Sequence, residues 1–508
     1  MVMNKKINKL WGSAFEQSPT KELIAFTGGR DVHGVEAVDY KLLYYDLWGN
    51  KAHAYMLYKQ GIIEKKDVKT ILKGLLEIEK LVEAKKFFLD PQKEDVHTNV
   101  ESFLIDKYGI GIAGKLHTAR SRNDQSNLDT RLYLRDNVIL FSQKISDLAN
   151  CLCKQAALYK NIPVPGFTHH QHAMVTTLGH IYMTFAAMMV RDAERMTNWF
   201  ALHNTNPLGA AASYGTSFPI DQKLTASMLA FDDIDTSSLD YITNRWEPEA
   251  DLAFAITVLM NHLSTMAETL ILFSTAEFGM LKLSDMFSTG SSMMPQKKNP
   301  DPLEIIKGKA SLSAGFLLSL IGSGKGTLIG YNRDSQWTKY LISDLIDECM
   351  PAPSIMKGIF ETLTIDKEKM HYWTTKDFIG ATSLLEQLSW KYSISFRKAK
   401  IVVEKAVKYS KGEELVTYTA LNKALKEENF DIKVSAQQVI AWQDPVAILK
   451  NTNSIGGPGQ DSLKLSLQDL NKKLKKLDQW IMKKANKKKM ALAILEENIK
   501  AVLTGGKS

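Results

Sequence analysis

Residues 251–283 read DLAFAITVLMNHLSTMAETLILFSTAEFGMLKL. Their apolar side chains recur at positions 252, 256, 259, 263, 266, 270 and 273, with spacings that alternate between four and three residues. This repeat gives a helix one apolar stripe, by which it packs against other helices in a bundle. If all of these residues are helical, the helix extends over roughly 50 Å. The stretch therefore predicts a long helix inside a helical bundle.

Further stretches of the chain carry a helical repeat of comparable length. They are residues 128–156, with Val138, Phe141, Ile145, Leu148 and Leu152 on one stripe, residues 176–202, and a run from Pro302 to about Leu320. No alternating strand pattern separates them, so the sequence predicts an all-α protein built on this bundle. Residues 176–190 are apolar almost all round the helix, which predicts burial within a large assembly.

Shorter helical runs flank this centre, at residues 46–63, 68–84 and 382–412. The change in helix length predicts three regions: an N-terminal helical domain at 1–119, a central long-helix bundle at 120–370 and a C-terminal helical domain at 371–508. A chain of 508 residues is long enough for several domains.

The composition favours a cytoplasmic protein. Apolar residues make up 44% of the chain and charged residues 24%, both ordinary for a soluble globular protein. Apolar stretches such as 314–322 are too short to span a bilayer, and residues 1–12 lack the apolar segment of a secretory signal. Cys151, Cys153 and Cys349 have the spacing of neither a zinc site nor a disulfide framework, which fits a reducing compartment.

The net charge of +8 is unevenly placed, because residues 471–490 contribute nine lysines. Leu474, Leu477 and Ile481 recur there at helical spacing, which favours the solvated face of a C-terminal helix. Binding of a nucleic acid or an anionic membrane is the alternative. The segment contains no arginine, so we expect neither a nucleic-acid nor a membrane partner.

Two polar clusters stand out from the helical background as possible binding segments. The first, HTARSRNDQ at 117–125, immediately precedes a predicted helix, where free backbone N–H groups favour an anion. An elaborate helix cap with a solvated loop is the alternative interpretation. The second, YNRDSQWTK at 331–339, is equally dense in hydrogen-bonding groups.

A third cluster, PGFTHHQHA at 165–173, contains histidines at 169, 170 and 172. This spacing is poor for one face of a helix, where ligands four residues apart would be wanted, and the cluster contains no cysteine or carboxylate. A metal site is therefore disfavoured. A histidine that donates or accepts a proton fits better, because its ordinary pKa lies near neutral pH.

The fourth cluster, GSSMMPQKKNPD at 290–301, interrupts the helices with Gly290, Pro295 and Pro300 around two serines and two lysines. A simple connector needs none of the lysines. The chain has no G-x-S-x-G elbow, phosphate-binding P-loop or dinucleotide fingerprint. We interpret the segment as a mobile loop that carries catalytic groups and closes over a substrate.

Taken together, these segments resemble a known family. GSSMMPQKKNP resembles the signature of the fumarase/aspartase superfamily, and within it the chain is similar to the argininosuccinate lyases. The motifs that carry this resemblance are KLWG (9–12), EDVHTNVE (94–101), GKLHTARSRNDQ (114–125), GFTHHQ (166–171), PLGAAASYGTSFPID (207–221), KLSD (282–285) and YNRD (331–334). The resemblance extends from about residue 9 to at least Gly457.

The resemblance implies an enzyme that cleaves argininosuccinate to arginine and fumarate, the last step of arginine biosynthesis. It implies a homotetramer formed around a central helical bundle, with each active site shared between subunits. No cofactor or metal is implied.

The resemblance also assigns catalytic roles. Ser291 is the implied base, with its alkoxide stabilised by loop amides and nearby cations. Lys297 and Asn299 donate to the negative charge that develops on a substrate carboxylate. His169 is the implied acid for the leaving nitrogen, and Glu304 orients it.

The implied substrate-binding residues fall into two sets. Ser121, Arg122, Asn123 and Thr168 bind the substrate carboxylates, whereas Arg245, Tyr331, Gln336 and Lys339 hold the arginine side. The chain departs from the family pattern at His172, Trp246 and Trp337, none of which belongs to the implied catalytic set.

Two alternative functions remain. One is another fumarate-releasing carbon–nitrogen lyase such as an adenylosuccinate lyase, which the 117–125 and 331–334 segments disfavour. The other is a non-catalytic relative of the crystallin type, which the presence of the full catalytic set disfavours.

Overall fold

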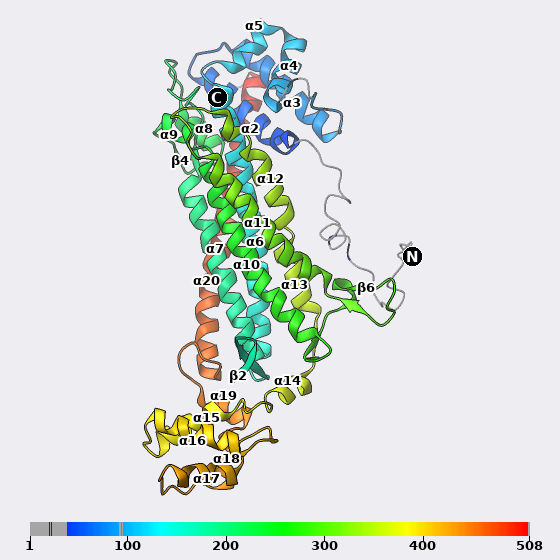
Figure 1. The fold of residues 1–508 in the computed structure, drawn as a ribbon. Coiled ribbons are helices and arrows are strands. Elements are labelled where there is room, and N and C mark those ends of the chain that lie inside the picture. The colour runs from blue at the N-terminus through cyan, green and yellow to red at the C-terminus, as the bar shows by residue number, and fades with distance from the viewer. Residues whose placement is uncertain (1–19, 21, 23–37, 91–92, 94, 506–508) are drawn as a thin grey trace.

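The computed structural model describes residues 20, 22, 38–90, 93 and 95–505. The KLWG motif at 9–12 and Glu94 of the EDVHTNVE motif lie outside the described residues. Helices make up most of the described chain, and its strands are short, so the all-α prediction is confirmed. Figure 1 shows an elongated bundle of upright helices with smaller groups of helices at its two ends.

Long helices form the bundle. They are α6 (Arg122–Leu158), α7 (Leu178–His203), α10 (Glu247–Ser274), α11 (Asp301–Ser323), α12 (Thr338–Cys349), α13 (Ala352–Thr362) and α20 (Gln460–Thr504). The four long helical stretches predicted from the repeats correspond to α6, α7, α10 and α11. With 37 residues, α6 extends over roughly 55 Å. The apolar stripes of these helices meet in one continuous core.

The helix predicted over 251–283 ends earlier than its apolar pattern indicates. Helix α10 stops at Ser274, and Thr275 already has extended backbone angles. Gly279 then takes a positive φ of 57°, which turns the chain so that Leu281 pairs with Ile365 in a short sheet. The later apolar residues are therefore buried by strand pairing and not by continuation of the helix.

The start of α6 is fixed by its cap. The Ser121 hydroxyl accepts a hydrogen bond from the Asn123 N–H at 3.3 Å, and the Asp124 carboxyl accepts from the Ser121 N–H at 2.9 Å. The second Asp124 oxygen accepts from the N–H groups of Gly209 at 3.1 Å and Ala211 at 2.8 Å. Asp124 therefore fastens the loop that follows α7 against the first turn of α6.

A group of shorter helices covers the end of the bundle at which α6 begins (Figure 1). It comprises α2 (Asp39–Lys59), α3 (Lys65–Glu83), α4 (Val96–Tyr108), α5 (Ile110–Ala113), η3 (Gly114–His117), α8 (Gln222–Met228), α9 (Ser238–Thr243) and η5 (Arg333–Gln336). Most of α2 is buried against α6, α3 and α4. This end brings charged side chains from distant parts of the sequence together.

The opposite end carries a separate lobe with its own apolar core, formed around Leu384, Leu388, Val402, Leu421 and Leu425. The helices there are α14 (Lys367–Trp373), α15 (Ala381–Lys391), α16 (Phe396–Tyr409), α17 (Tyr418–Glu427), α18 (Ala436–Ala441) and α19 (Pro445–Asn451).

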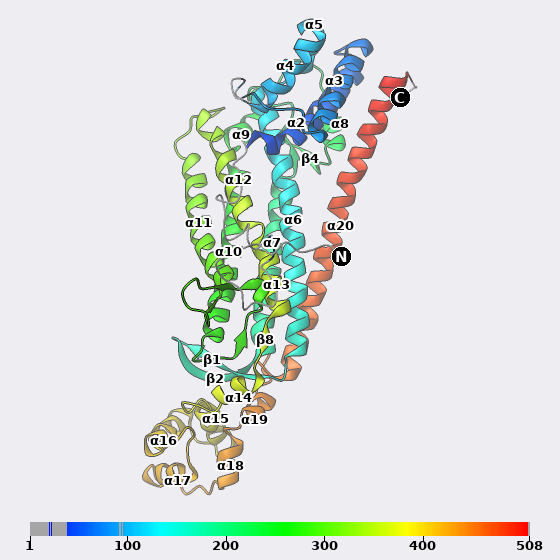
Figure 2. The same cartoon turned by 90° about the vertical axis from the view of Figure 1, so that its right-hand side faces the viewer.

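After this lobe the chain returns along the bundle as α20 (Figure 2). Leu474, Leu477 and Ile481 of its lysine-rich segment are buried, as the helical spacing predicts. Lys484 and Lys487 form ion pairs with Asp232 at 2.6 Å. Helix α20 packs against α6 and α7, although the predicted division places it in the C-terminal region. The boundaries at 119 and 370 stay a prediction.

The strands form two-stranded sheets only. The pairs are β1 (Pro163–Thr168) with β2 (Gln171–Thr177), β5 (Leu281–Lys282) with β8 (Thr364–Ile365) and β6 (Thr289–Gly290) with β7 (Lys298–Asn299), all antiparallel, and β3 (Thr205–Asn206) with β4 (Asp233–Ile234), which is parallel. A short η4 (Asp285–Phe287) precedes β6.

Two helices, α10 and α11, are long and apolar enough to cross a membrane by length and composition alone. Half of the apolar window of α10 is buried in the bundle, as expected of a core helix, but only 22% of the α11 window is buried. Helix α11 therefore presents apolar side chains that the single chain does not cover.

Candidate active site

A charged pocket of about 240 Å³ lies at the end of the bundle where α6 begins. It is formed by the starts of α2, α4 and α6, the turn between α9 and α10, and the segment 331–339. Six of the eight predicted substrate-binding residues line it: Arg122, Asn123, Arg245, Tyr331, Gln336 and Lys339. The fold thus unites residues that are more than two hundred positions apart in the sequence. We call this site the charged pocket.

The cations of the charged pocket are held by carboxylates and hydroxyls. The Lys339 ammonium forms a buried ion pair with Asp39, and Arg122 approaches Asp95 at 3.4 Å. The Arg245 guanidinium is only 4% exposed and donates to the Ser126 hydroxyl at 3.1 Å. These fixed positive groups suit a ligand that carries carboxylates.

Tyr331, Gln336 and Asn123, together with Arg333, complete the same wall. The Tyr331 hydroxyl donates to the Gln336 side-chain oxygen at 3.4 Å, and Arg333 Nε donates to the same oxygen at 3.1 Å. The Asn123 amide donates to the Ala212 carbonyl at 3.1 Å. Ser121 lies beside the pocket as the N-cap of α6 rather than on its wall.

Sequence reasoning missed several residues of the charged pocket. Asp39, Asp95, His97 and Arg333 line it but were not singled out. Arg333 belongs to the polar 331–339 cluster, so the density of that cluster could have indicated it. Asp39 and Asp95 stand at the starts of helices, where the sequence alone gives them only a capping role.

Two buried carboxylates, Asp46 and Asp129, lie next to His97, which lines the charged pocket. Among the described residues, Asp46, His97 and Asp129 place three possible metal ligands within 4.8 Å of one another. However, Asp46 accepts hydrogen bonds from His97 Nδ1 at 2.8 Å, from Gln125 at 2.6 Å and from Asn50 at 2.8 Å. These N–H groups occupy the Asp46 oxygens, and burial raises the pKa of Asp129 well above its ordinary range, which favours the neutral acid. The cluster is therefore better suited to fixing the His97 ring than to binding a metal.

The predicted His169 lies elsewhere, at the tip of the β1–β2 hairpin (Figure 1). His169 and His170 form its two-residue turn, with φ of 54° and 60°. Left-handed backbone is costly for residues other than glycine, and such strain is concentrated at functional sites. Thr168 and both histidines are exposed at this tip, at the end of the bundle opposite the charged pocket.

The loop 291–297 is the connection of the β6–β7 hairpin, in which Thr289 pairs with Asn299 and Gly290 with Lys298. The Ser291 hydroxyl oxygen accepts hydrogen bonds from the N–H groups of Met293 at 3.2 Å and Met294 at 3.0 Å. Two amides thus point at the oxygen that the resemblance assigns as a base.

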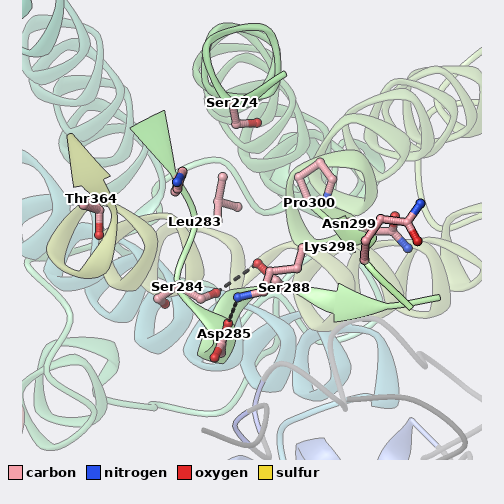
Figure 3. A pocket seen from close by; sticks show the side chains of 11 residues that line it. Ser274, Leu283, Ser284, Asp285, Ser288, Lys298, Asn299, Pro300 and Thr364 are labelled. Carbon is pink, nitrogen blue, oxygen red and sulfur yellow. Dashed lines mark hydrogen bonds and ion pairs between the residues drawn. The ribbon is translucent and has the colours of Figure 1, made fainter. Parts of the chain in front are cut away.

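A second pocket of about 660 Å³ borders this loop (Figure 3). Lys298 forms an ion pair with Asp285 inside it, and Asn299 lies on the same wall. Lys297 is exposed and does not line this pocket. Lys297, to which the resemblance assigns a catalytic role, is therefore exposed in the single chain.

The predicted catalytic residues do not meet within one chain. Glu304 is exposed in the first turn of α11, and no hydrogen bond or ion pair between His169 and Glu304 occurs in the part of the chain that the structure describes. The elements that carry them, the start of α6 for the charged pocket, the β1–β2 hairpin for His169 and the β6–β7 hairpin for Ser291, lie at three separate places on the molecule (Figure 1).

Comparisons with known proteins show the family to which the chain belongs. A family model described as "Lyase" matches residues 35–315. The argininosuccinate lyase of Limosilactobacillus fermentum is 38% identical over 466 residues, covering 91% of this chain and 98% of that protein. The argininosuccinate lyase of Caldanaerobacter subterraneus subsp. tengcongensis is 37% identical, covering 89% and 99% respectively.

Solved structures share the same bundle. EDDS lyase in complex with formate superposes with a TM-score of 0.87 at 26% identity, covering 96% of this chain and 97% of that one. The 3-carboxy-cis,cis-muconate lactonizing enzyme of Pseudomonas putida, at 16% identity and a TM-score of 0.68, shares the fold, covering 87% and 96%. The long-helix bundle is thus that of the fumarase/aspartase superfamily of lyases. Within it, this chain belongs to the argininosuccinate lyase family.

Proposed function

We propose that this protein is a carbon–nitrogen lyase that converts argininosuccinate to L-arginine and fumarate, and so completes arginine biosynthesis. The observation that carries the proposal is the charged pocket, in which six residues expected to bind this substrate come together. Its three arginines and one lysine suit carboxylates, and the oxygens of Tyr331 and Gln336 suit an ammonium group.

The reaction is an elimination that needs a base. We assign this role to Ser291, whose alkoxide takes a proton from the succinate carbon next to a carboxylate and becomes the hydroxyl. Its two amide hydrogen bonds support the assignment, because they stabilise negative charge on the serine oxygen. The electron pair of the broken C–H bond moves onto the neighbouring carboxylate, which Lys297 and Asn299 are assigned to hold.

The electron pair then returns to form the carbon–carbon double bond of fumarate as the carbon–nitrogen bond breaks. The leaving nitrogen takes a proton, for which His169 is the assigned donor, directly or through water, with Glu304 as its orienting carboxylate. Thr168 and Ser121 are assigned to the substrate carboxylates. No cofactor enters this scheme, and neither does a metal.

We further propose that the active site is shared between the subunits of a homotetramer. The separation of the three groups of site residues within one chain supports this. So does α11 at the outer edge of the bundle (Figure 2), where Leu318 is 73% and Ile321 50% exposed. Exposed apolar surface of this kind marks protein–protein contact.

We place the protein in the cytoplasm. The three cysteines are free and buried, so none of them forms a disulfide that an oxidising compartment would favour. The substrate of the proposed reaction is a small molecule, and the proposal requires no nucleic acid and no membrane.

Purified protein should release fumarate from argininosuccinate, which ultraviolet absorbance follows directly. Adenylosuccinate serves as the parallel substrate in the same assay. Preference for adenylosuccinate would leave the elimination chemistry in place but overturn the assigned substrate. Activity on neither substrate would favour a non-catalytic relative of the crystallin type.

A further inference from the structure

A carboxyl group lies behind the charged pocket without lining it. Glu249, in the first turn of α10, is 2% exposed. One of its oxygens lies 3.2 Å from the fully buried Thr338 hydroxyl, which shares its hydrogen between this carboxylate and the Ser335 carbonyl at 2.8 Å. Thr338 directly precedes Lys339, which lines the pocket. Glu249 therefore contacts the inner side of the segment whose outer side forms the pocket wall.

The other Glu249 oxygen has no hydrogen-bond partner among the described residues, although it is buried. Nε of Arg245, Nε of Arg131 and the hydroxyl of Tyr241 are likewise buried without a partner. Buried polar groups are usually paired, so a cluster of unpaired ones next to a binding site needs an explanation. Such groups are free to change partners when a ligand or a proton binds.

Arg245 connects this cluster to the pocket. Its terminal nitrogen donates to Ser126, and its guanidinium lies 5.8 Å from the centre of the Tyr331 ring. Ser126 and Tyr331 both line the charged pocket. The guanidinium therefore contacts the pocket at Ser126 and Tyr331, while its Nε is buried without a hydrogen-bond partner among the described residues. The charge of Glu249 acts on this guanidinium electrostatically.

We propose that Glu249 is a positioning residue that acts through Arg245, and that its protonation sets how much positive charge the pocket offers to a substrate carboxylate. This inference rests on the proposed function for the identity of the substrate. It adds a residue that neither touches the substrate nor takes part in the elimination.

Opposing influences act on the Glu249 carboxyl. Burial raises its pKa to about 7, while the guanidinium groups of Arg245 and of Arg131 on α6, together with the Thr338 hydroxyl, favour the charged form. Arg131 is itself paired with Asp235 at 3.4 Å. The carboxyl therefore changes charge near neutral pH, where the enzyme would work.

The charges of Glu249 and Arg245 determine whether substrate binding strengthens or weakens as the pH rises. Neutral Glu249 leaves the full charge of Arg245 available to an anionic ligand, whereas ionised Glu249 cancels part of it. The coupling is reciprocal, so a bound carboxylate also favours the protonated form of Glu249. Substrate binding should thus weaken as the pH rises through the Glu249 transition.

The test compares Glu249→Gln with the parent protein. This substitution keeps the shape and the acceptor for Thr338 but removes the charge. Between pH 6 and pH 8 we expect the KM of the parent for argininosuccinate to rise by about threefold or more. In Glu249→Gln the rise should be absent, and the KM at both pH values should be near the low parent value.

Glu247→Gln is the matched control, because it removes an exposed carboxylate from the same turn of α10. It should reproduce the parent profile. The inference is overturned if Glu249→Gln keeps the parent dependence of KM on pH, or if Glu247→Gln loses it equally.

Thr338→Val provides a second, independent variant. It removes the hydrogen bond that favours the charged form of Glu249, so the rise in KM should move to higher pH. An unchanged transition in a folded Thr338→Val protein also contradicts the inference.

Succinate binding, measured by calorimetry at pH 6 and pH 8, separates this inference from the proposed function. A parent protein that releases no fumarate from argininosuccinate disproves the function. The effect of Glu249 on ligand binding is then measured with succinate alone. Succinate should bind to the parent more weakly at pH 8 than at pH 6, and to Glu249→Gln with equal affinity at both pH values.

Discussion

The hydroxyl oxygen of Ser291 accepts a hydrogen bond from the backbone N–H of Met294 at 3.0 Å. The hairpin connection at residues 291–297 is thereby folded back over the serine, although residues 292–297 are exposed and none of its side chains belongs to the core. A hydroxyl is a poor base unless its negative charge is stabilised in place. This contact supports the assignment of Ser291 as the base, which the amino-acid composition of the loop alone only suggests.

Ser291→Ala should lower the turnover number by roughly 10²–10⁴-fold, the usual contribution of a positioned general base. The substitution removes one oxygen from an exposed loop and creates no core cavity, so thermal unfolding should be unchanged. Ser292→Ala, at the exposed neighbouring position, is the control and should retain parent activity. Near-normal fumarate release by Ser291→Ala would remove this residue from the role of base.

Lys339→Met should raise the KM for argininosuccinate strongly, because it deletes a cation from the charged pocket. The buried ion pair with Asp39 means that it should also destabilise the fold, since an unpaired buried carboxylate costs about 3–5 kcal/mol. The double variant Asp39→Asn, Lys339→Met should recover most of this stability but not the KM. Equal argininosuccinate affinity in the parent and the double variant would contradict the assigned role.

Glu249→Gln should change the pH dependence of stability. The pKa of about 7 in the folded chain exceeds the ordinary value of 4.5, so the folded state binds the proton more tightly than the unfolded state. The parent therefore loses stability as pH rises between about 4.5 and 7, by roughly 3 kcal/mol in total. Denaturant unfolding at pH 5 and pH 8 should show this loss in the parent and Glu247→Gln, and a smaller loss in Glu249→Gln.

Treatment with a chelator should leave the fumarate-release activity intact. The elimination as proposed uses Lys297 and Asn299 to hold the developing charge, and the Asp46 oxygens are already occupied by N–H donors. Activity should be measured before and after extensive dialysis against the chelator. Loss of activity that a divalent ion restores would overturn the metal-free scheme.

Leu318→Glu should weaken the assembly, since this side chain is the most exposed of the large apolar residues on α11. Light scattering should detect smaller species, and activity should fall with them because the site is proposed to need several subunits. Leu465→Glu, on the exposed face of α20, is the matched control and should stay assembled. An active, fully assembled Leu318→Glu protein would argue against α11 as the contact surface.

The sequence by itself determined that the protein is a helical bundle and indicated the class of reaction that it catalyses. Alternating spacings of three and four residues are a local property, so they predicted the bodies of α6, α7, α10 and α11 without knowledge of their neighbours. Ser121 and Asp124 fixed the start of α6 through contacts three residues apart. The family signature at 290–300 is contiguous and could also be found by reading along the chain.

Only the tertiary structure decided where α10 ends and which residues share a pocket. The apolar pattern continues beyond Ser274, but pairing of Leu281 with Ile365 replaces the helix, and that partner is more than eighty residues away. The role proposed for Glu249 could not be predicted from the sequence for the same reason. Its burial, its contact with Thr338 and its position behind Arg245 arise from packing between separate segments, and burial is what moves the pKa of a carboxyl group toward neutrality.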